Sequence, residues 1–293
     1  MSVASAMLIA VLLVAGHQEI QRNRQAVVRH DERLGELTAA GRVLVLVVTN
    51  GERDAVLRSV RDHVGQDATL DYVGARTVYT LGSVEGTEVL LAQAGEQGTA
   101  PAAGMLMTAH DVIEQCRPDY VVLVGICFGL RPDEGQHIGD IIVARRVHNT
   151  DHRKLTDGDN GRDIINRGAN VGCSPKLLDR FQAAGSTWAG PRVHFGTVLT
   201  SNTLMNSKSA VIKLRTKFPD AIAGEMEGSG VHEASTLSVK PDWILVKATS
   251  DWGYGKSNNA QPQAAKNAAD YVTHVVASGA LRQRPPHRSP SSP

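Results

Sequence analysis

The sequence contains few aromatic side chains, few cysteines and no excess of either charge. Aromatic residues make up 4% of the 293 positions, and 31 Lys and Arg residues stand against 30 Asp and Glu residues. Proteins that bind nucleic acids typically carry a basic excess and stack aromatic rings on bases, so this composition argues against a nucleic-acid partner. The three cysteines form no CxxC pair. We therefore expect neither a disulfide framework nor a cysteine-rich zinc site, and we predict a reducing compartment, the cytoplasm.

The sequence also lacks a hydrophobic run of membrane-spanning length. Residues 3–15 are almost entirely apolar, but a spanning helix needs roughly 20 residues, and the segment has no basic start such as a secretory signal carries. We expect residues 1–40 to form an N-terminal extension, apolar and then polar, with a helix that is buried or packs in an oligomer; contact with a membrane is the alternative. Residues 282–293 are rich in Pro, Ser and Arg and are predicted to be disordered.

Between these ends, residues 41–281 alternate strand-like and helix-like segments. Strands are predicted at 42–49, 87–94, 120–124, 138–147, 193–199 and 243–248, several of them continuous apolar runs typical of strands buried on both faces. Helices are predicted at 54–64, 100–116, 174–184, 208–217, 225–236 and 264–281. The polar segment 153–172 is expected to be a loop. The alternation predicts one α/β domain with three layers, αβα, around a twisted, mostly parallel central sheet.

Polar and charged residues gather where the predicted strands end. Ligands of open α/β sheets bind at the carboxyl ends of strands, so these positions are candidate site residues. Glu52 and Asp54 follow the first strand, Gly125 begins a glycine-rich turn after another, and Ser250-Asp251 follow the last strong strand. The segment Glu225-Met226-Glu227 opens a predicted helix.

The order and spacing of these segments carry a resemblance. Gly196, the pair Leu204-Met205, Glu225-Met226-Glu227 and Ser250-Asp251 follow one another as in the nucleoside phosphorylase/nucleosidase superfamily, and Gly125 to Leu130 with Ile138 to Ile141 match it upstream. The chain most resembles the 5′-methylthioadenosine/S-adenosylhomocysteine nucleosidase branch. It departs from the family at the turn Ile126-Cys127-Phe128, where Ser-Ala-Gly is usual, at Leu204 in place of an aromatic residue, and at Asp54 in place of Glu.

The resemblance implies hydrolysis of the N-glycosidic bond of a purine nucleoside or nucleotide, with adenine favoured as the released base and with no metal or other cofactor. Breaking this bond needs an acid at the purine, and Asp251 is our choice. Glu227 is expected to hold the ribose hydroxyls, with Met226 packing on the sugar. Asp54 is the first choice for activating water and Glu52 the second, each such acid or base role contributing about 10²–10⁴-fold in rate. The further substrate-binding residues predicted are Glu225, Leu204, Met205, Ser250, Gly125, Cys127 and Phe128.

Three alternatives stay open at this point: a phosphate-dependent phosphorylase, a housekeeping methylthioadenosine/S-adenosylhomocysteine nucleosidase, and a domain that senses nucleotides without catalysis. A phosphorylase would need arginines near the glycine-rich turns, where Arg131 is the nearest candidate. The glycine-rich turn also resembles nucleosidase effectors of bacterial anti-phage defence, and the family implies a homo-oligomer, a dimer or larger. The basic segment 145–154, with Arg153 and Lys154, predicts a 5′-phosphate on the substrate; a solvated basic strand end is the alternative.

Overall fold

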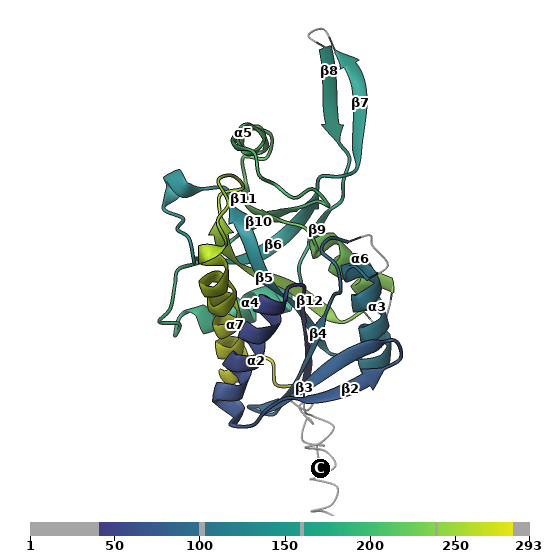
Figure 1. Cartoon of the computed structure of the whole chain (residues 1–293), viewed down its shortest axis with the longest axis vertical. Helices are drawn as coiled ribbons and strands as arrows, with labels where there is room; N and C mark the ends of the chain where they lie inside the picture. Colours follow the sequence, from purple (N-terminus) through teal and green to yellow (C-terminus); the bar gives the residue numbers. More distant parts are fainter. Residues whose placement is uncertain (1–40, 100–102, 159–160, 238–239, 284–293) are drawn as a thin grey trace, which may run out of the picture. The chain divides into compact units, whose positions relative to one another are not determined.

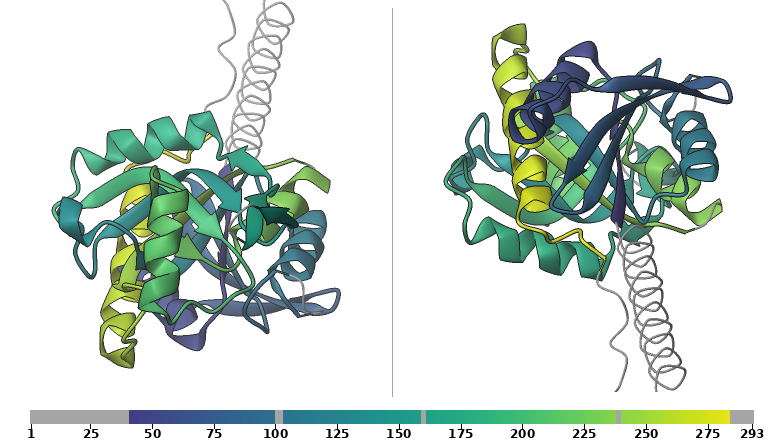
Figure 2. Two further views of the ribbon diagram at one scale, coloured as in Figure 1. Left: turned by 90° about the horizontal axis from the view of Figure 1, so that it is seen from above. Right: turned by 90° about the horizontal axis from the view of Figure 1, so that it is seen from below.

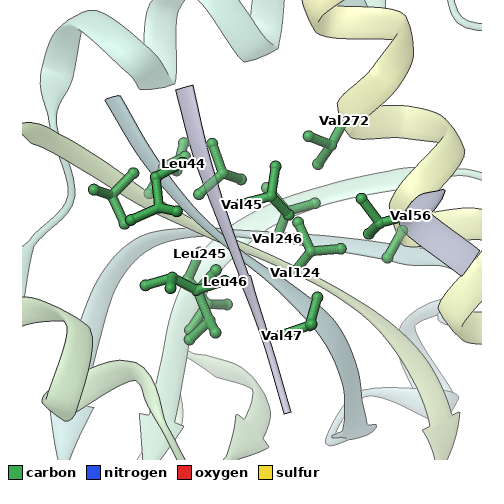
Figure 3. Packing of buried hydrophobic residues seen from close by; sticks show 14 of the residues in the cluster. Leu44, Val45, Leu46, Val47, Val56, Val124, Leu245, Val246 and Val272 are labelled. Carbon is green, nitrogen blue, oxygen red and sulfur yellow. The ribbon is translucent and has the colours of Figure 1, made fainter. Parts of the chain in front are cut away.

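The apolar run at the start of the domain forms strand β1 (Gly41–Val47), which lies in the middle of a sheet. It pairs in parallel with β4 (Thr87–Gln93) on one side and with β5 (Tyr120–Gly129) on the other. Val45 and Val47 point to one side of β1 (Figure 3). Val56 of helix α2 (Asn50–Val64) and Val272 of α7 (Gln261–Ala277) lie on that side and complete a buried core. The apolar run 42–49, predicted to be a strand buried on both faces, therefore forms such a strand.

The structure, a computed structural model, describes residues 41–99, 103–158, 161–237 and 240–283. Within them, ten strands form one sheet in the order β11-β10-β6-β12-β5-β1-β4-β3-β2, with β9 beside β6. The strands not yet given are β2 (Thr69–Val73), β3 (Arg76–Val84), β6 (Ile141–Asn149), β9 (Asn170–Gly172), β10 (Val193–Thr200), β11 (Ala221–Glu225) and β12 (Asp242–Asp251). The predicted extension 1–40 and the tail from residue 284 onward lie outside the described residues.

The sheet is mixed, and part of it closes on itself. Parallel pairs join β4, β1, β5 and β12 in one block, and β6, β10 and β11 in another. Strand β12 meets β6 in antiparallel fashion, and β11 turns back to pair with the end of β5, where Gly224 lies opposite Phe128. Strands β5, β12, β6, β10 and β11 therefore form a closed ring. The ring brings the ends of β5, β11 and β12 together.

Helices cover both faces of the sheet, which confirms the predicted α/β fold of three layers. Helices α2 and α4 (Pro175–Gly185) pack against α7, and α7 lies on β5 and β12. On the opposite face, α3 (Met105–Cys116) packs against α6 (Gly228–Leu237), and α6 lies on β6 and β12. Figures 1 and 2 show these two groups on either side of the strands. Helix α5 (Lys208–Lys217) lies near β10 and β11, where Val211 joins a small separate core.

Three local predictions are wrong. The glycine-rich segment 125–129 is not a turn after a strand, because β5 continues to Gly129. The segment 153–172 contains a hairpin of β7 (Arg153–Gly158) and β8 (Gly161–Asn166), which extends away from the sheet in Figure 1, and then β9. Glu225 does not begin a helix, because it is the last residue of β11 and α6 starts at Gly228. Among the described residues, no helix combines the length and the apolar character needed to cross a membrane.

Candidate active site

A cavity of about 110 Å³ opens at the ends of β5, β11 and β12. Most of the site residues predicted from the sequence line it, although they come from distant parts of the chain. They are Glu52, Cys127, Phe128, Leu204, Met205, Glu225, Met226, Glu227, Ser250 and Asp251. The predicted residues that do not line it are Asp54, Gly125, Arg153 and Lys154.

Glu52 reaches the cavity from the first turn of α2. Thr49 caps this helix: its hydroxyl accepts the Glu52 N–H at 3.2 Å, and its own N–H donates to the Glu52 carboxylate at 2.8 Å. The carboxylate also accepts the N–H groups of Val48 at 3.0 Å and Ile126 at 2.9 Å. Glu52 is 3% exposed. Three backbone donors therefore fix one buried carboxylate between the ends of β1 and β5.

Asp54, the first choice for activating water, is not brought to the cavity. Its side chain is 43% exposed, and its Oδ1 accepts hydrogen bonds from the guanidinium of Arg53 at 2.8 and 2.9 Å. The cause is helical geometry, since two residues turn the side-chain direction by about 200° around the axis. Glu52 faces the strand ends, and Asp54 faces away from them.

Glu225, Glu227 and Lys247 form a buried charged cluster below the cavity. The Lys247 ammonium group lies 3.2 Å from Glu227 Oε2 and 3.7 Å from Glu225 Oε2, and the lysine side chain is 1% exposed. The Glu225 carboxylate accepts the N–H groups of Glu227 at 2.9 Å and Gly228 at 3.0 Å, and so holds the turn from β11 into α6. Glu227 Oε1 accepts the Gly98 N–H at 3.1 Å. The lysine thus neutralises carboxylates that would otherwise be costly to bury.

The pKa values in this cluster follow from burial and from charge. Burial raises the pKa of the Glu225 carboxyl group, and the nearby Lys247 offsets only part of this effect. Burial by itself would lower the pKa of the Lys247 ammonium group. The carboxylates of the cluster and of Glu52 outweigh burial, so the pKa of Lys247 is raised and it stays charged at neutral pH.

Asp251 ends β12 and faces the same cavity, with its side chain 11% exposed. Its Oδ1 accepts the Gly253 N–H at 2.7 Å, and its Oδ2 lies 3.0 Å from the Ser250 hydroxyl and 3.9 Å from the Lys256 ammonium group. These contacts orient the carboxyl group at the rim of the strand ring. Leu204, Met205 and Met226 supply apolar surface around it.

The glycine-rich end of β5 differs from the family pattern, and the structure shows what its residues contact. A Cβ at Gly125 would lie 2.2 Å from Glu52 Oε1, so glycine is needed for the carboxylate to approach the strand, although Gly125 does not line the cavity. A Cβ at Gly224 would lie 2.2 Å from the ring of Phe128. Burial raises the pKa of the Cys127 thiol, which therefore stays protonated and is a poor nucleophile.

A second cavity of about 430 Å³ adjoins the first and shares Phe128, Thr203, Met205 and Glu225 with it. Arg153 lines this second cavity, whereas Lys154 lines neither. The carboxylates of Glu52 and Glu227 border only the first cavity. The structure therefore does not place Arg153 and Lys154 beside the carboxylates of Glu52 and Glu227, because the hairpin that carries them extends away from the sheet.

Two lysines of the site were not found from the sequence. Lys247 has a signal, since it is a charged residue in the middle of the apolar run 243–248. Such a residue must have a buried partner, which the sequence does not identify. Lys256 lies in the loop between β12 and α7 and lines the cavity near Asp251. No regular spacing connects it to the other site residues.

Comparison with known proteins agrees with this fold. The model of the phosphorylase superfamily matches residues 42–277, so the chain belongs to this superfamily. A death domain-containing ATP nucleosidase of Amphimedon queenslandica is 25% identical over 82% of this chain, which spans 49% of that relative. A 5′-methylthioadenosine/S-adenosylhomocysteine nucleosidase of Geobacillus sp. (strain WCH70) is 26% identical, over 70% of this chain and 87% of its own length.

Solved structures show the same fold. A 5′-methylthioadenosine/S-adenosylhomocysteine nucleosidase from Colwellia psychrerythraea 34H in complex with adenine has a TM-score of 0.67 and 22% sequence identity. The similarity covers 84% of this chain and 97% of that one. It confirms the predicted nucleoside phosphorylase-like architecture.

Proposed function

We propose that this chain hydrolyses the N-glycosidic bond of a purine nucleoside or nucleotide and releases the free base. The observation that carries the proposal is that Glu52, Glu227 and Asp251, from three separate parts of the chain, face one cavity. The reaction needs three such groups, since it breaks a bond to a leaving purine, develops positive charge on the ribose and adds water. The relatives named as nucleosidases support the same reaction.

In this proposal Asp251 donates a proton to N7 of the purine. The contacts with the Gly253 N–H and the Ser250 hydroxyl fix the carboxyl group in the direction of the cavity. Leu204 and Met205 provide apolar surface for the faces of the base. Protonation makes the purine a better leaving group, which is the role of a general acid.

Glu227 binds the ribose hydroxyls, and Met226 packs against the sugar. The carboxyl group of Glu227 is buried, and the Lys247 ammonium group lies 3.2 Å from its Oε2. A negative carboxylate near the sugar also favours the positive charge that develops on the ribose as the bond breaks. Lys247 itself acts as a positioning residue, since it holds the carboxylate in place.

Glu52 takes the role of activating water in place of Asp54. Its Oε1 accepts one backbone N–H, from Ile126, and Glu52 faces the cavity. A water molecule next to this oxygen would lose a proton to the carboxylate as it attacks the anomeric carbon. Asp54 is paired with Arg53 outside the cavity and is not needed for this step.

The contacts of Arg131 favour hydrolysis over phosphorolysis. Its guanidinium donates to the backbone oxygens of Phe218 at 3.1 Å and Pro219 at 2.6 Å, so it is used to hold the chain and not to bind phosphate in the cavity. Of the described residues that line the cavity, Lys256 alone carries a positive charge.

The 5′ end of the substrate is proposed to carry phosphate. This proposal is supported by the relative named an ATP nucleosidase. Arg153 and Lys154 do not support it, because neither lines the cavity that Glu52 and Glu227 border. Adenine remains the favoured base. The homo-oligomer, the cytoplasmic location and the anti-phage role stay predictions.

The test is to incubate the full chain with adenosine, guanosine, AMP, ATP and methylthioadenosine, each with and without inorganic phosphate, and to separate the products. We expect free base and a ribosyl product whose 1-position carries hydroxyl, formed at the same rate in both conditions, and faster turnover of the nucleotides. Ribose 1-phosphate with strict phosphate dependence would identify a phosphorylase. Binding without any product would identify a sensor.

A further inference from the structure

Phe128 occupies an unusual place between the two cavities. It lines both of them, and it packs beside the small core of Leu199, Val211 and Phe218. Its ring also fills the space above Gly224, where a Cβ would lie 2.2 Å from the ring. The surroundings are therefore shaped around an aromatic side chain at this position. In the family pattern, glycine is usual at the position of Phe128, so the aromatic ring between the two cavities is a property of this chain.

The strand pairing places Phe128 next to the proposed proton donor. In the register of β5 and β12, Asp251 lies opposite Phe128. In a purine, N7 and the exocyclic group at C6 lie on the same edge of the base. If N7 contacts Asp251, the C6 substituent therefore also faces this side of the cavity. In this orientation the register puts Phe128 beside the C6 substituent, and Phe128 also lines the second cavity.

We propose that Phe128 is a specificity-determining residue that limits the purine to a small C6 substituent. This inference rests on the proposed function, because it takes the purine orientation from Asp251. The second cavity, which Phe128 also lines, is large enough to hold the bulky C6 substituent that the ring excludes. A cavity of about 150 Å³ holds a benzene molecule, and the second cavity has about 430 Å³ with the apolar side chains of Leu199, Leu214 and Phe218 in its lining.

The predicted consequence is a change in selectivity and not merely in rate. Wild-type protein should bind adenine and reject N6-benzyladenine, since the benzyl group meets the Phe128 ring. Phe128→Ala should join the two cavities and admit the benzyl group. A pocket that excludes a substituent by size typically discriminates by about 10–200-fold, so the ratio of the two affinities should change by at least about tenfold.

The experiment measures the affinity of the full chain for adenine and for N6-benzyladenine by calorimetry, in wild type, Phe128→Ala, Phe128→Leu and Leu214→Ala. Leu214 is the matched control because it lines only the second cavity. We expect the ratio to shift strongly in Phe128→Ala, to a smaller degree in Phe128→Leu, and not in Leu214→Ala. If Phe128→Ala does not fold, the shift in Phe128→Leu decides.

Three results would overturn the inference: equal binding of both bases by wild type, an unchanged ratio in the Phe128 variants that still bind adenine, or an equal shift in Leu214→Ala. These results are independent of hydrolysis. A shifted ratio in a protein that hydrolyses no nucleoside or nucleotide would support the role of Phe128 and contradict the proposed function. Wild type that binds no purine would overturn both.

Discussion

Replacing Lys247 by methionine tests whether the buried cluster depends on its positive charge. Methionine keeps much of the length of the side chain but removes the charge, which leaves Glu225 and Glu227 buried without a cation at 3.2–3.7 Å. The side chains of Lys247 and Glu225 are each 1% exposed, and that of Glu227 is 7% exposed. Removing one partner from a salt bridge as buried as this costs about 3–5 kcal/mol. That is a large part of the roughly 5–15 kcal/mol that stabilises a domain.

The loss should depend on pH, with a defined sign. The pKa of Glu225 is raised in the folded protein, so the folded state binds this proton more tightly than the unfolded state. The stability linked to this group is therefore greatest in acid and is lost as pH rises from the unfolded pKa through the folded one. Without Lys247 the pKa of Glu225 rises further. The difference between Lys247→Met and wild type should then be smaller at pH 5.5 than at pH 7.5.

The assay is urea unfolding of wild type, Lys247→Met and Lys247→Arg at both pH values. The matched control is Lys266→Met, which removes an exposed lysine that pairs with Asp270 one turn along α7 and should cost about 0.5 kcal/mol or less. Lys247→Arg keeps the charge and should recover most of the stability. The reasoning would be refuted if Lys247→Met unfolded at the same urea concentration as wild type, or if its deficit grew on acidification.

Further expectations concern the reaction and the contact between Gly224 and Phe128. Asp251→Asn should fold normally and lose about 10²-fold or more in kcat, since it removes the proton donor; a rate within tenfold of wild type would exclude that role. Glu52→Gln should lose about as much, while Asp54→Asn keeps the wild-type rate, and the reverse result would restore the sequence-based choice. Gly224→Ala should lower the free energy of unfolding by about 1–3 kcal/mol because the new methyl group meets Phe128. The same change should cost less in a Phe128→Ala background, as a double-mutant cycle can show.

The elements that could be predicted from the sequence are those with one dominant physical cause. The runs that became β1, β5 and β12 are apolar on both faces because helices cover both sides of the sheet. Strand β2 and the hairpin of β7 and β8 were missed because they lie at the edge of the sheet or outside it. The side chains that the structure describes in these strands are largely exposed, so burial leaves no apolar pattern in the sequence.

The candidate site shows the same division. Glu227 and Asp251 were found because a motif marks them, and both line the cavity. The sequence ranked Asp54 ahead of Glu52, whereas the structure turns Glu52 to the cavity and Asp54 away from it. Thr49 and Glu52 form a capping box, a pattern of Thr followed three residues later by Glu that was visible in the sequence and places the helix start. The sequence did not identify the partners of Lys247. The carboxylates of Glu225 and Glu227 lie about 20 residues away in the sequence and contact the lysine only because the strand ring brings them together.

The closed strand ring has a consequence for how the protein fluctuates. Its strands are hydrogen-bonded to neighbours on both sides, including the pairing of β11 with β5 that removes a free edge. Backbone amides in such strands exchange with solvent mainly when the whole domain unfolds, whereas the exposed edge strand β2, which pairs only with β3 in the sheet, can open alone. The backbone that carries Phe128, Glu225 and Asp251 is thereby insulated from motion at the open edge. A cut or an inserted tag in the β2–β3 turn would then leave the spacing of the reacting groups intact.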